Sequence, residues 1–220
     1  MKKFLTTILA VLLAAPSFAQ LNSGGFSIDG NSVYYGVRLG ANFASIGGDD
    51  FVSSLGGDEL GTKVGLNLAG IIGLRLSDNT PLFLESGLYY TERGAKDGSN
   101  KVSLTYLEIP LLIKYGIQAT DDIAVLPFIG PYFSLGIAGK TKFPEVDSDG
   151  KIHTASQGSY HNFNRSDMGI KFGCGAEYNK LYLELGYQFG LANIADFHLP
   201  SGEDASCHGN ALFLNFGVNF

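Results

Sequence analysis

The side chains best suited to metal or covalent chemistry lie in two polar stretches late in the chain, 139–166 and 192–209. Imidazole and thiolate groups are common protein ligands for Zn²⁺ and haem iron. The residues of this kind in the two stretches are His153, His161, His198, Cys207 and His208. Their spacing matches no ligand motif, so we predict no metal and no cofactor. Capture of a metal ion or haem by the loop histidines stays open as an alternative.

His198, Ser201 and Glu203 come nearest to a catalytic set. Nucleophilic or general-base catalysis needs a histidine within hydrogen-bond reach of a hydroxyl or carboxyl group. The three residues fall in one loop, at a spacing unsuited to that geometry. We therefore predict a protein that is not an enzyme, and we keep a lipid-modifying enzyme as the weaker alternative.

The elements that must carry these stretches are eight segments in which apolar and polar residues alternate. A period of two is typical of β-strands with one apolar face. Each segment has about ten residues, the length that a tilted strand needs to cross a bilayer. We expect strands at 35–43, 63–76, 82–93, 102–116, 125–138, 167–178, 181–191 and 210–220.

The connections between these segments alternate in length. Long connections are expected at 44–62, 94–101, 139–166 and 192–209, and short ones at 77–81, 117–124 and 179–180. An even strand count with this alternation is typical of bacterial outer-membrane barrels, whose short turns lie in the periplasm. The pattern predicts an all-β fold, an eight-stranded antiparallel transmembrane up-and-down β-barrel with periplasmic termini and extracellular long loops.

The start of the chain predicts export. Lys2 and Lys3 precede a short apolar run and a small-residue site at Ala19, which is typical of a cleaved secretory signal peptide. Cleavage leaves 13 basic and 21 acidic side chains, a net charge of −8. So acidic a chain, with no basic cluster, argues against nucleic acid as a partner. We expect a signal peptide at 1–19, a periplasmic amino-terminal arm at 20–32 and the barrel domain at 33–220.

The polar face of the strands indicates which side meets lipid. It carries glycines and a few charges of both signs, whereas a water-facing surface would carry dense Lys and Glu. A small eight-stranded interior is filled by side chains, and mixed charges can pair within it. We expect this interior to be a structural plug, with a narrow proton or ion path as the alternative. The expected lumen charges are Arg38, Arg75, Glu85, Glu108, Lys114, Lys171, Glu177 and Glu184.

Aromatic residues mark the expected lipid-facing surface. Tyrosines near strand ends on the apolar face are typical of an interfacial girdle. They are Tyr35, Tyr90, Tyr115, Tyr178 and Tyr187. The last expected strand ends in Phe220, which we predict to be the signal read by the barrel-assembly machinery. The expected partners are outer-membrane lipid, that machinery, and a protein at the cell surface or in a secretion system.

The stretch Tyr106-Leu107-Glu108-Ile109-Pro110-Leu111-Leu112-Ile113-Lys114 resembles a signature of the PorT-like outer-membrane β-barrel proteins of Bacteroidetes. Residues 127–132, 169–177 and 187–194 are similar to later strands of that family, and the resemblance covers essentially the whole mature chain. It implies an outer-membrane barrel without catalytic residues. The family's namesake is linked to type IX secretion and gliding. An accessory role in secretion is therefore an alternative to the structural or surface-interaction role predicted here.

Overall fold

The computed structural model describes residues 33–47, 61–77, 79–97, 100–146, 152–158, 163–196 and 206–220. The predicted signal peptide at 1–19 and arm at 20–32 lie outside these residues and stay predictions. Among the described residues, no helix is long and apolar enough to cross a membrane.

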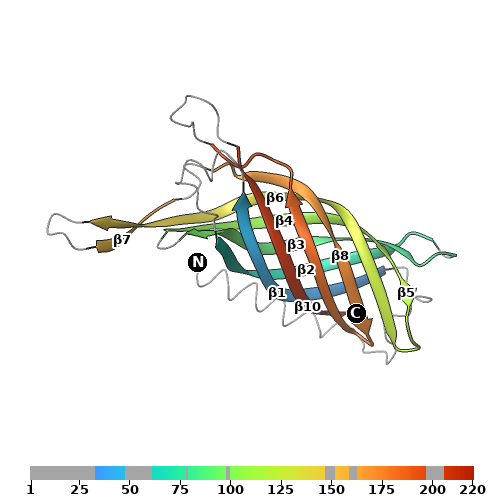
Figure 1. The fold of residues 1–220 in the computed structure, drawn as a ribbon. Helices are drawn as coiled ribbons and strands as arrows, with labels where there is room; N and C mark the ends of the chain where they lie inside the picture. Colours follow the sequence, from blue (N-terminus) through green and yellow to red (C-terminus); the bar gives the residue numbers. More distant parts are fainter. Residues whose placement is uncertain are drawn as a thin grey trace.

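The described β-strands form one antiparallel sheet that closes on itself (Figure 1). Eight of them form the wall, because β1 pairs with β10 and β4 pairs with β6. This confirms the predicted eight-stranded antiparallel all-β barrel. The strand bounds are β1 Val33–Gly47, β2 Gly61–Arg75, β3 Leu82–Asp97, β4 Asn100–Tyr115, β5 Ile117–Gln118, β6 Ile123–Val146, β7 Ile152–Gln157, β8 Ser166–Tyr178, β9 Leu181–Gly190 and β10 His208–Asn219.

The two ends of the barrel differ. Connections 76–81, 116–122 and 179–180 lie at one end, here called the short-turn end. The opposite end, called the long-loop end, carries the connections 48–60 and 191–207. Asn179 takes a φ of 55°, a left-handed conformation that Asn tolerates, and this confirms the predicted two-residue hairpin turn.

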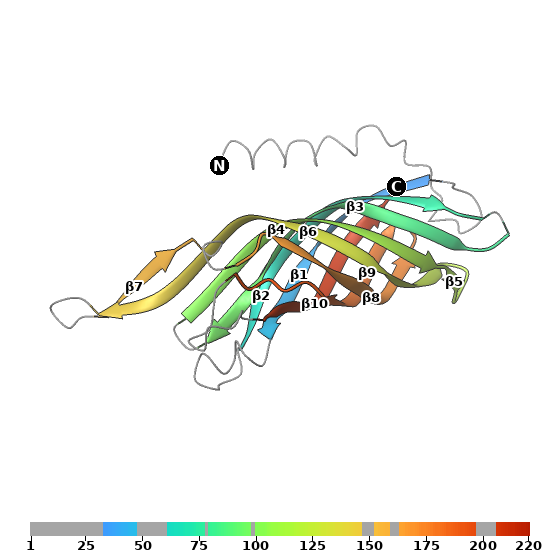
Figure 2. The ribbon, with the colours of Figure 1, turned by 90° about the horizontal axis from the view of Figure 1, so that it is seen from above.

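Strands at the long-loop end are longer than predicted. β6 runs through Val146 and pairs with β7, so the first part of the expected loop 139–166 is strand. Figures 1 and 2 show this β6–β7 hairpin projecting beyond the wall. β3 runs to Asp97 and β4 begins at Asn100, which corrects the expected loop 94–101. A backbone ladder persists here without apolar alternation, because strand pairing does not require an apolar face.

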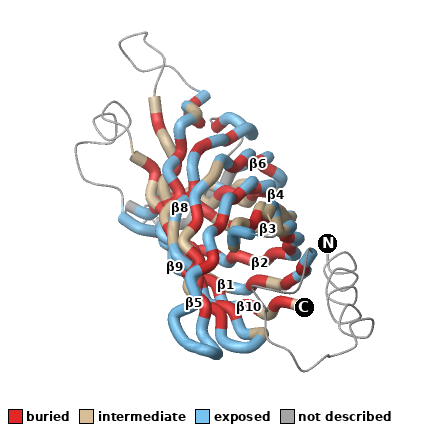
Figure 3. The backbone as a smooth tube through the Cα atoms, turned by 90° about the vertical axis from the view of Figure 1, so that its right-hand side faces the viewer, coloured by how far each residue is buried: buried red, intermediate tan, exposed pale blue. Residues whose placement is uncertain are grey.

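Buried and exposed residues alternate along the wall strands (Figure 3). Large apolar side chains point outward, and Leu39, Ile129 and Phe216 each expose more than half of their surface. Of the expected girdle, Tyr35, Tyr115 and Tyr178 are exposed on this outer face, and Tyr90 and Tyr187 are half-buried on it. Polar and charged side chains point inward. An apolar exterior around a polar interior is the arrangement of a barrel that sits in lipid.

Pro110 and Pro131 interrupt the ladder between β4 and β6. Proline has no N–H to donate, and the pairing lapses on one side of the Pro110–Tyr132 pair. On the other side of β4, Ser86 Oγ donates a hydrogen bond of 2.7 Å to the Pro110 carbonyl. Both strands continue through the gap, so the prolines weaken the wall locally without ending it.

Candidate functional site: the barrel lumen

Ten buried charged side chains of the described residues converge on the interior of the barrel. Five are positive and five are negative, so their formal charges balance. Burying a charge is costly unless it is paired, and this balance makes pairing possible. We call this set the lumen network. Its members are Arg38, Lys63, Arg93, Lys114 and Lys171, with Glu85, Glu108, Asp167, Glu177 and Glu184.

Arg93 is the centre of the cluster nearer the long-loop end. Its Nη2 lies 2.7 Å from Glu108 Oε2, and its Nη1 lies 2.6 Å from Asp167 Oδ2. Lys171 pairs with the other oxygen of Glu108. Ser134 Oγ accepts a bond of 2.7 Å from Arg93 and donates one of 2.9 Å to Glu108. These contacts tie β3, β4, β6 and β8 together across the interior.

Glu85 is the centre of the cluster nearer the short-turn end. Its Oε1 lies 2.8 Å from Lys114 Nζ, and its Oε2 lies 3.6 Å from Arg38 Nη2. The Tyr34 hydroxyl donates a hydrogen bond of 2.8 Å to Glu85. Lys114 Nζ also lies 3.8 Å from Glu184 Oε2. This cluster joins β1, β3, β4 and β9.

Aromatic rings fill the space between the two clusters. The rings of Phe128 and Phe213 stack with their centres 6.3 Å apart. Lys114 Nζ lies 5.2 Å from the centre of the Phe128 ring, and Lys171 Nζ lies 5.0 Å from that of Phe213. Cation–π attraction stabilises an ammonium group at such distances. The interior is therefore packed from one ionic cluster to the other.

Amide side chains bind the carboxylates that the cations do not fully satisfy. Asn219 Nδ2 donates a bond of 2.7 Å to Glu177, and Asn215 Nδ2 donates one of 2.7 Å to Glu184. Among the described residues, no cation lies within ion-pair distance of Glu177. Neutral amides thus extend the network toward the short-turn end.

An apolar cluster packs at the long-loop end. Its buried members are Ile46, Ala95, Leu104, Tyr106, Phe163, Ile194, Ala195 and Cys207. Asn193 Oδ1 holds the segment in place by accepting bonds of 3.0 Å and 2.9 Å from the N–H groups of Ala195 and Cys207. Burial raises the pKa of the Cys207 thiol to about 12. The thiol is therefore protonated at neutral pH, and it is unsuited to act as a nucleophile or metal ligand.

Seven of the eight expected lumen charges lie in the network. Arg75 is the exception, because it sits half-buried where β2 ends. Its Nε donates a bond of 2.8 Å to the Ser77 carbonyl. Arg75 is on the expected inward face of β2. Because it is the last residue of the strand, its side chain bonds to the backbone of the following turn instead of entering the lumen network.

Three charged residues of the network, Arg93, Asp167 and Lys63, are absent from the set expected on sequence. The alternation of inward and outward side chains along each strand could have identified them in the sequence. Arg93 is on the face of Glu85, and Asp167 is on the face of Lys171. Lys63 Nζ donates a bond of 3.4 Å to the Arg93 carbonyl, close to the same cluster.

The residues considered for metal or catalytic chemistry are mostly outside the described part of the chain. His161, His198, Ser201 and Glu203 all fall in undescribed segments. Nδ1 of His208 lies 2.9 Å from the Ala192 carbonyl oxygen. Within the described ranges, no three His, Cys, Asp or Glu side chains gather as a metal site would require.

Solved outer-membrane barrels resemble this chain at low identity. The attachment invasion locus protein Ail of Yersinia pestis is 14% identical, with a TM-score of 0.44 over 86% of this chain and 100% of that one. Neisserial surface protein A is 18% identical, with a TM-score of 0.46 over 86% and 98%. A major outer membrane protein from Thermus thermophilus is 16% identical, with a TM-score of 0.49 over 86% and 100%. Similarity at this level says nothing about function.

No curated protein matches the sequence. A family model does: that of the outer membrane protein β-barrel domain matches residues 18–196, which is most of the chain. The match agrees with the closed wall, its apolar exterior and its charged interior. This chain is a small bacterial outer-membrane barrel and belongs to the outer membrane protein β-barrel domain family.

Proposed function

We propose that this protein is a non-conducting, non-enzymatic outer-membrane barrel that holds its long connections in place for contact with a surface partner. The lumen network carries the proposal. Arg93 links Glu108 and Asp167 across the interior, and Lys114 links Glu85 and Glu184 nearer the other end. A barrel of eight strands has just enough interior for side chains, and these fill it.

The long-loop end is the end that we propose to face the outside of the cell. Bacterial barrels have short turns on the periplasmic side and longer loops outside. The connections 48–60 and 197–205 carry acidic residues and no lysine or arginine in sequence, and they belong to this end. Loops on a rigid support are well suited to bind another protein, because the support reduces the ordering cost of binding.

The finer family assignment is also a proposal. We place the chain in the PorT-like branch on the strength of the motif at 106–114, two of whose residues, Glu108 and Lys114, belong to the lumen network. Proposed contacts common to such barrels are outer-membrane lipid and the assembly machinery, which would read the strand that ends at Phe220.

Conductance of the purified protein in planar bilayers tests the closed lumen. We expect no steady channel current, because the two ionic clusters and the Phe128–Phe213 stack fill the interior. A matched variant with Arg93, Glu108 and Lys171 replaced by Ala should conduct if it folds. Large, steady currents from the unmodified barrel would contradict the proposal.

Cross-linking on intact cells tests the surface role. A cross-linker that does not enter the cell should capture a defined protein on the barrel. Replacement of 48–60 by a short Gly/Ser turn should abolish the capture while heat-modifiable migration, the mark of a folded barrel, persists. Capture of the same protein at unchanged yield by this variant would exclude that loop as the contact. If no cross-linking reagent captures a protein on the barrel in a strain that produces it, this result would count against a surface partner.

A further inference from the structure

Four lysines stand together on strands β3, β4 and β6 at the long-loop end. Lys96 pairs directly with Lys101, and Lys101 pairs directly with Lys142. Lys140 lies two residues from Lys142 on the same strand. All four side chains are exposed. We call these four residues the lysine row.

The register places the lysine row on the outer face of the barrel. Directly paired residues share a face, and Lys101 is on the face of Ile109 and Leu111 because side chains alternate. On β6 the register shifts by one residue near Gly136. Beyond the shift, Gly139 pairs with Leu104, whose side chain points inward. Since side chains alternate along a strand, Lys140 and Lys142 therefore point outward.

Such a row is unfavourable without an anion. Like charges directly opposite one another destabilise a sheet. Among the carboxylates whose side chains the structure describes, which do not include those of Asp97 and Glu145, none lies within ion-pair distance of any of the four lysines. Glu92 is an outward acid on β3, but its carboxylate accepts hydrogen bonds from Tyr90 and Leu66. The row is therefore available to a negatively charged ligand.

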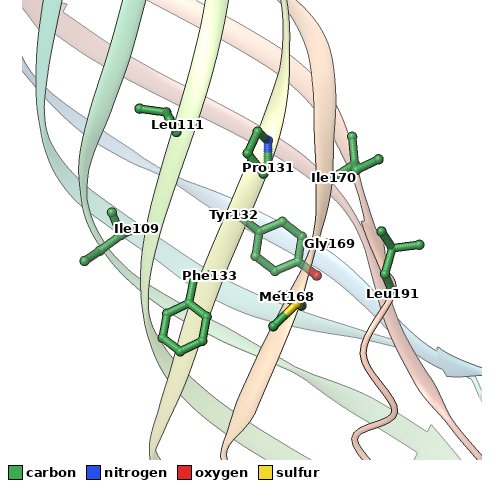
Figure 4. Close-up of a pocket in the computed structure, with 9 residues that line it drawn as sticks. All are labelled: Ile109, Leu111, Pro131, Tyr132, Phe133, Met168, Gly169, Ile170 and Leu191. Carbon is green, nitrogen blue, oxygen red and sulfur yellow. The ribbon is translucent and has the colours of Figure 1, made fainter.

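An apolar groove of about 430 Å³ lies on the same outer face, nearer the middle of the wall (Figure 4). Ile109 and Leu111 of β4 form one side, and Met168 and Ile170 of β8 form the other. Pro131 lies between them where the β4–β6 ladder lapses. The groove thus coincides with a break in the β4–β6 ladder and is open to the lipid.

The distance from the row to the groove suits one leaflet. Lys140 and Phe133, which lines the groove, are seven residues apart on β6, or about 24 Å along a strand. A strand tilt of about 40° reduces this to roughly 18 Å along the membrane normal. One leaflet has about 15 Å of hydrocarbon and a further 5–7 Å of headgroup. A lipid phosphate at the row and an acyl chain in the groove are therefore compatible.

We propose that this face of β3, β4, β6 and β8 binds a phosphorylated, multiply acylated lipid of the outer leaflet. The ammonium groups of the lysine row bind its phosphates, and the groove holds one of its acyl chains. The ammonium groups supply charge-assisted hydrogen bonds to phosphate oxygens. The choice of the outer leaflet rests on the proposed orientation of the long-loop end. The site lies outside the lumen and does not depend on whether the barrel conducts or binds a protein partner.

Native mass spectrometry of the detergent-purified barrel tests the site. The probes are bis-phosphorylated lipid A, the same lipid without phosphates, and a neutral phospholipid. The double variant Lys101→Gln/Lys142→Gln should bind the phosphorylated lipid about thirtyfold more weakly, since each lysine near an anionic surface contributes about a fivefold factor. Lys180→Gln at the short-turn end is the matched control and should bind normally.

Two results would overturn the proposal. One is equal binding of lipid A by the double variant and the unmodified barrel, with both shown to be folded by heat-modifiable migration. The other is equal binding of the phosphorylated and dephosphorylated lipids. Met168→Trp, which fills the groove, tests the second contact. It should weaken binding of acylated lipid A but not of its soluble, deacylated phosphosugar, and an equal effect on both would remove the groove from the site.

Discussion

Arg93 Nη1 lies 2.6 Å from Asp167 Oδ2, although their strands, β3 and β8, are separated in the wall by β4 and β6. The pair therefore spans the interior as a chord and does not simply link neighbours. Arg93 reaches Glu108 and Ser134 from the same guanidinium. One side chain thus fixes the spacing of four strands, and this makes Arg93 the most informative position to change.

Replacing Arg93 with Met should destabilise the barrel by about 3–5 kcal/mol, because Asp167 stays buried after losing its cation and Glu108 is left with Lys171 alone. Urea titration of the lipid-embedded protein, followed by its heat-modifiable migration, measures the change. Arg75→Met is the control. It lies half-buried at the rim and should cost less than about 1 kcal/mol. Equal losses in the two variants would show that the chord is unimportant.

Alanine should lower the folded yield of the barrel at one glycine of β2 and leave it unchanged at another. A Cβ at Gly73 would overlap the ring of Tyr34, whose hydroxyl is bound to Glu85. Overpacking of this kind costs about 1–3 kcal/mol. A Cβ at Gly70 would meet nothing within 4 Å, because Gly70 faces outward. The folded yield of Gly73→Ala should therefore drop while that of Gly70→Ala does not, and the reverse order would show that the assigned faces are wrong.

Cys207 should resist alkylation in the folded barrel. Its pKa of about 12 leaves almost no thiolate at pH 8, and the thiolate is the reactive form. In the Cys174→Ser variant, iodoacetamide labelling should be negligible at pH 8, should increase as the pH approaches 12, and should be complete after unfolding. The Cys207→Ser variant keeps Cys174 on the exposed outer face, where a membrane-soluble maleimide should react. Rapid labelling of Cys207 at pH 8 would contradict the packed cluster.

The projecting β6–β7 hairpin should be dispensable for folding. Lys142 and Ser156 are direct partners, so a two-residue Asn-Gly turn can replace 143–155 and join them. The variant should keep its heat-modifiable migration, because the wall part of β6 pairs with β4 and β8 before that point. Deleting 132–135, where both ladders use β6, should instead prevent folding. Loss of folding in the first variant would mean that the hairpin helps to form the wall.

Alternation predicts the barrel and the inward face because a wall strand between lipid and a polar lumen must repeat every two residues. It places Glu85, Lys114 and Glu184 on the inward face, and in the structure their side chains are buried. It does not reveal their partners, because alternation gives the face of a strand and not its height along the barrel. The pairing of Lys114 with both carboxylates depends on the register of β3, β4 and β9.

The alternation also ends where the apolar surroundings end. Strand ends such as 94–97 and 139–146 have no alternation of apolar and polar residues, so their sequence resembles that of a loop. Arg93 stands at that boundary and is therefore absent from the expected lumen charges. The same polar strand ends carry Lys96 and Lys142, which only the register brings together.

The β1–β10 pairing has a kinetic consequence. Its outermost pairs, Gly47–His208 and Gly36–Asn219, join residues 161 and 183 positions apart, whereas most wall contacts are local hairpins. Closing so long a loop is slow, and until it closes both edges of the sheet leave N–H and C=O groups without partners in lipid. Any half-open form in lipid is therefore high in free energy and sparsely populated. We expect a high activation barrier to opening of the closed wall. The lifetime of the folded barrel in the membrane should therefore be set by its unfolding rate more than by its equilibrium free energy of unfolding.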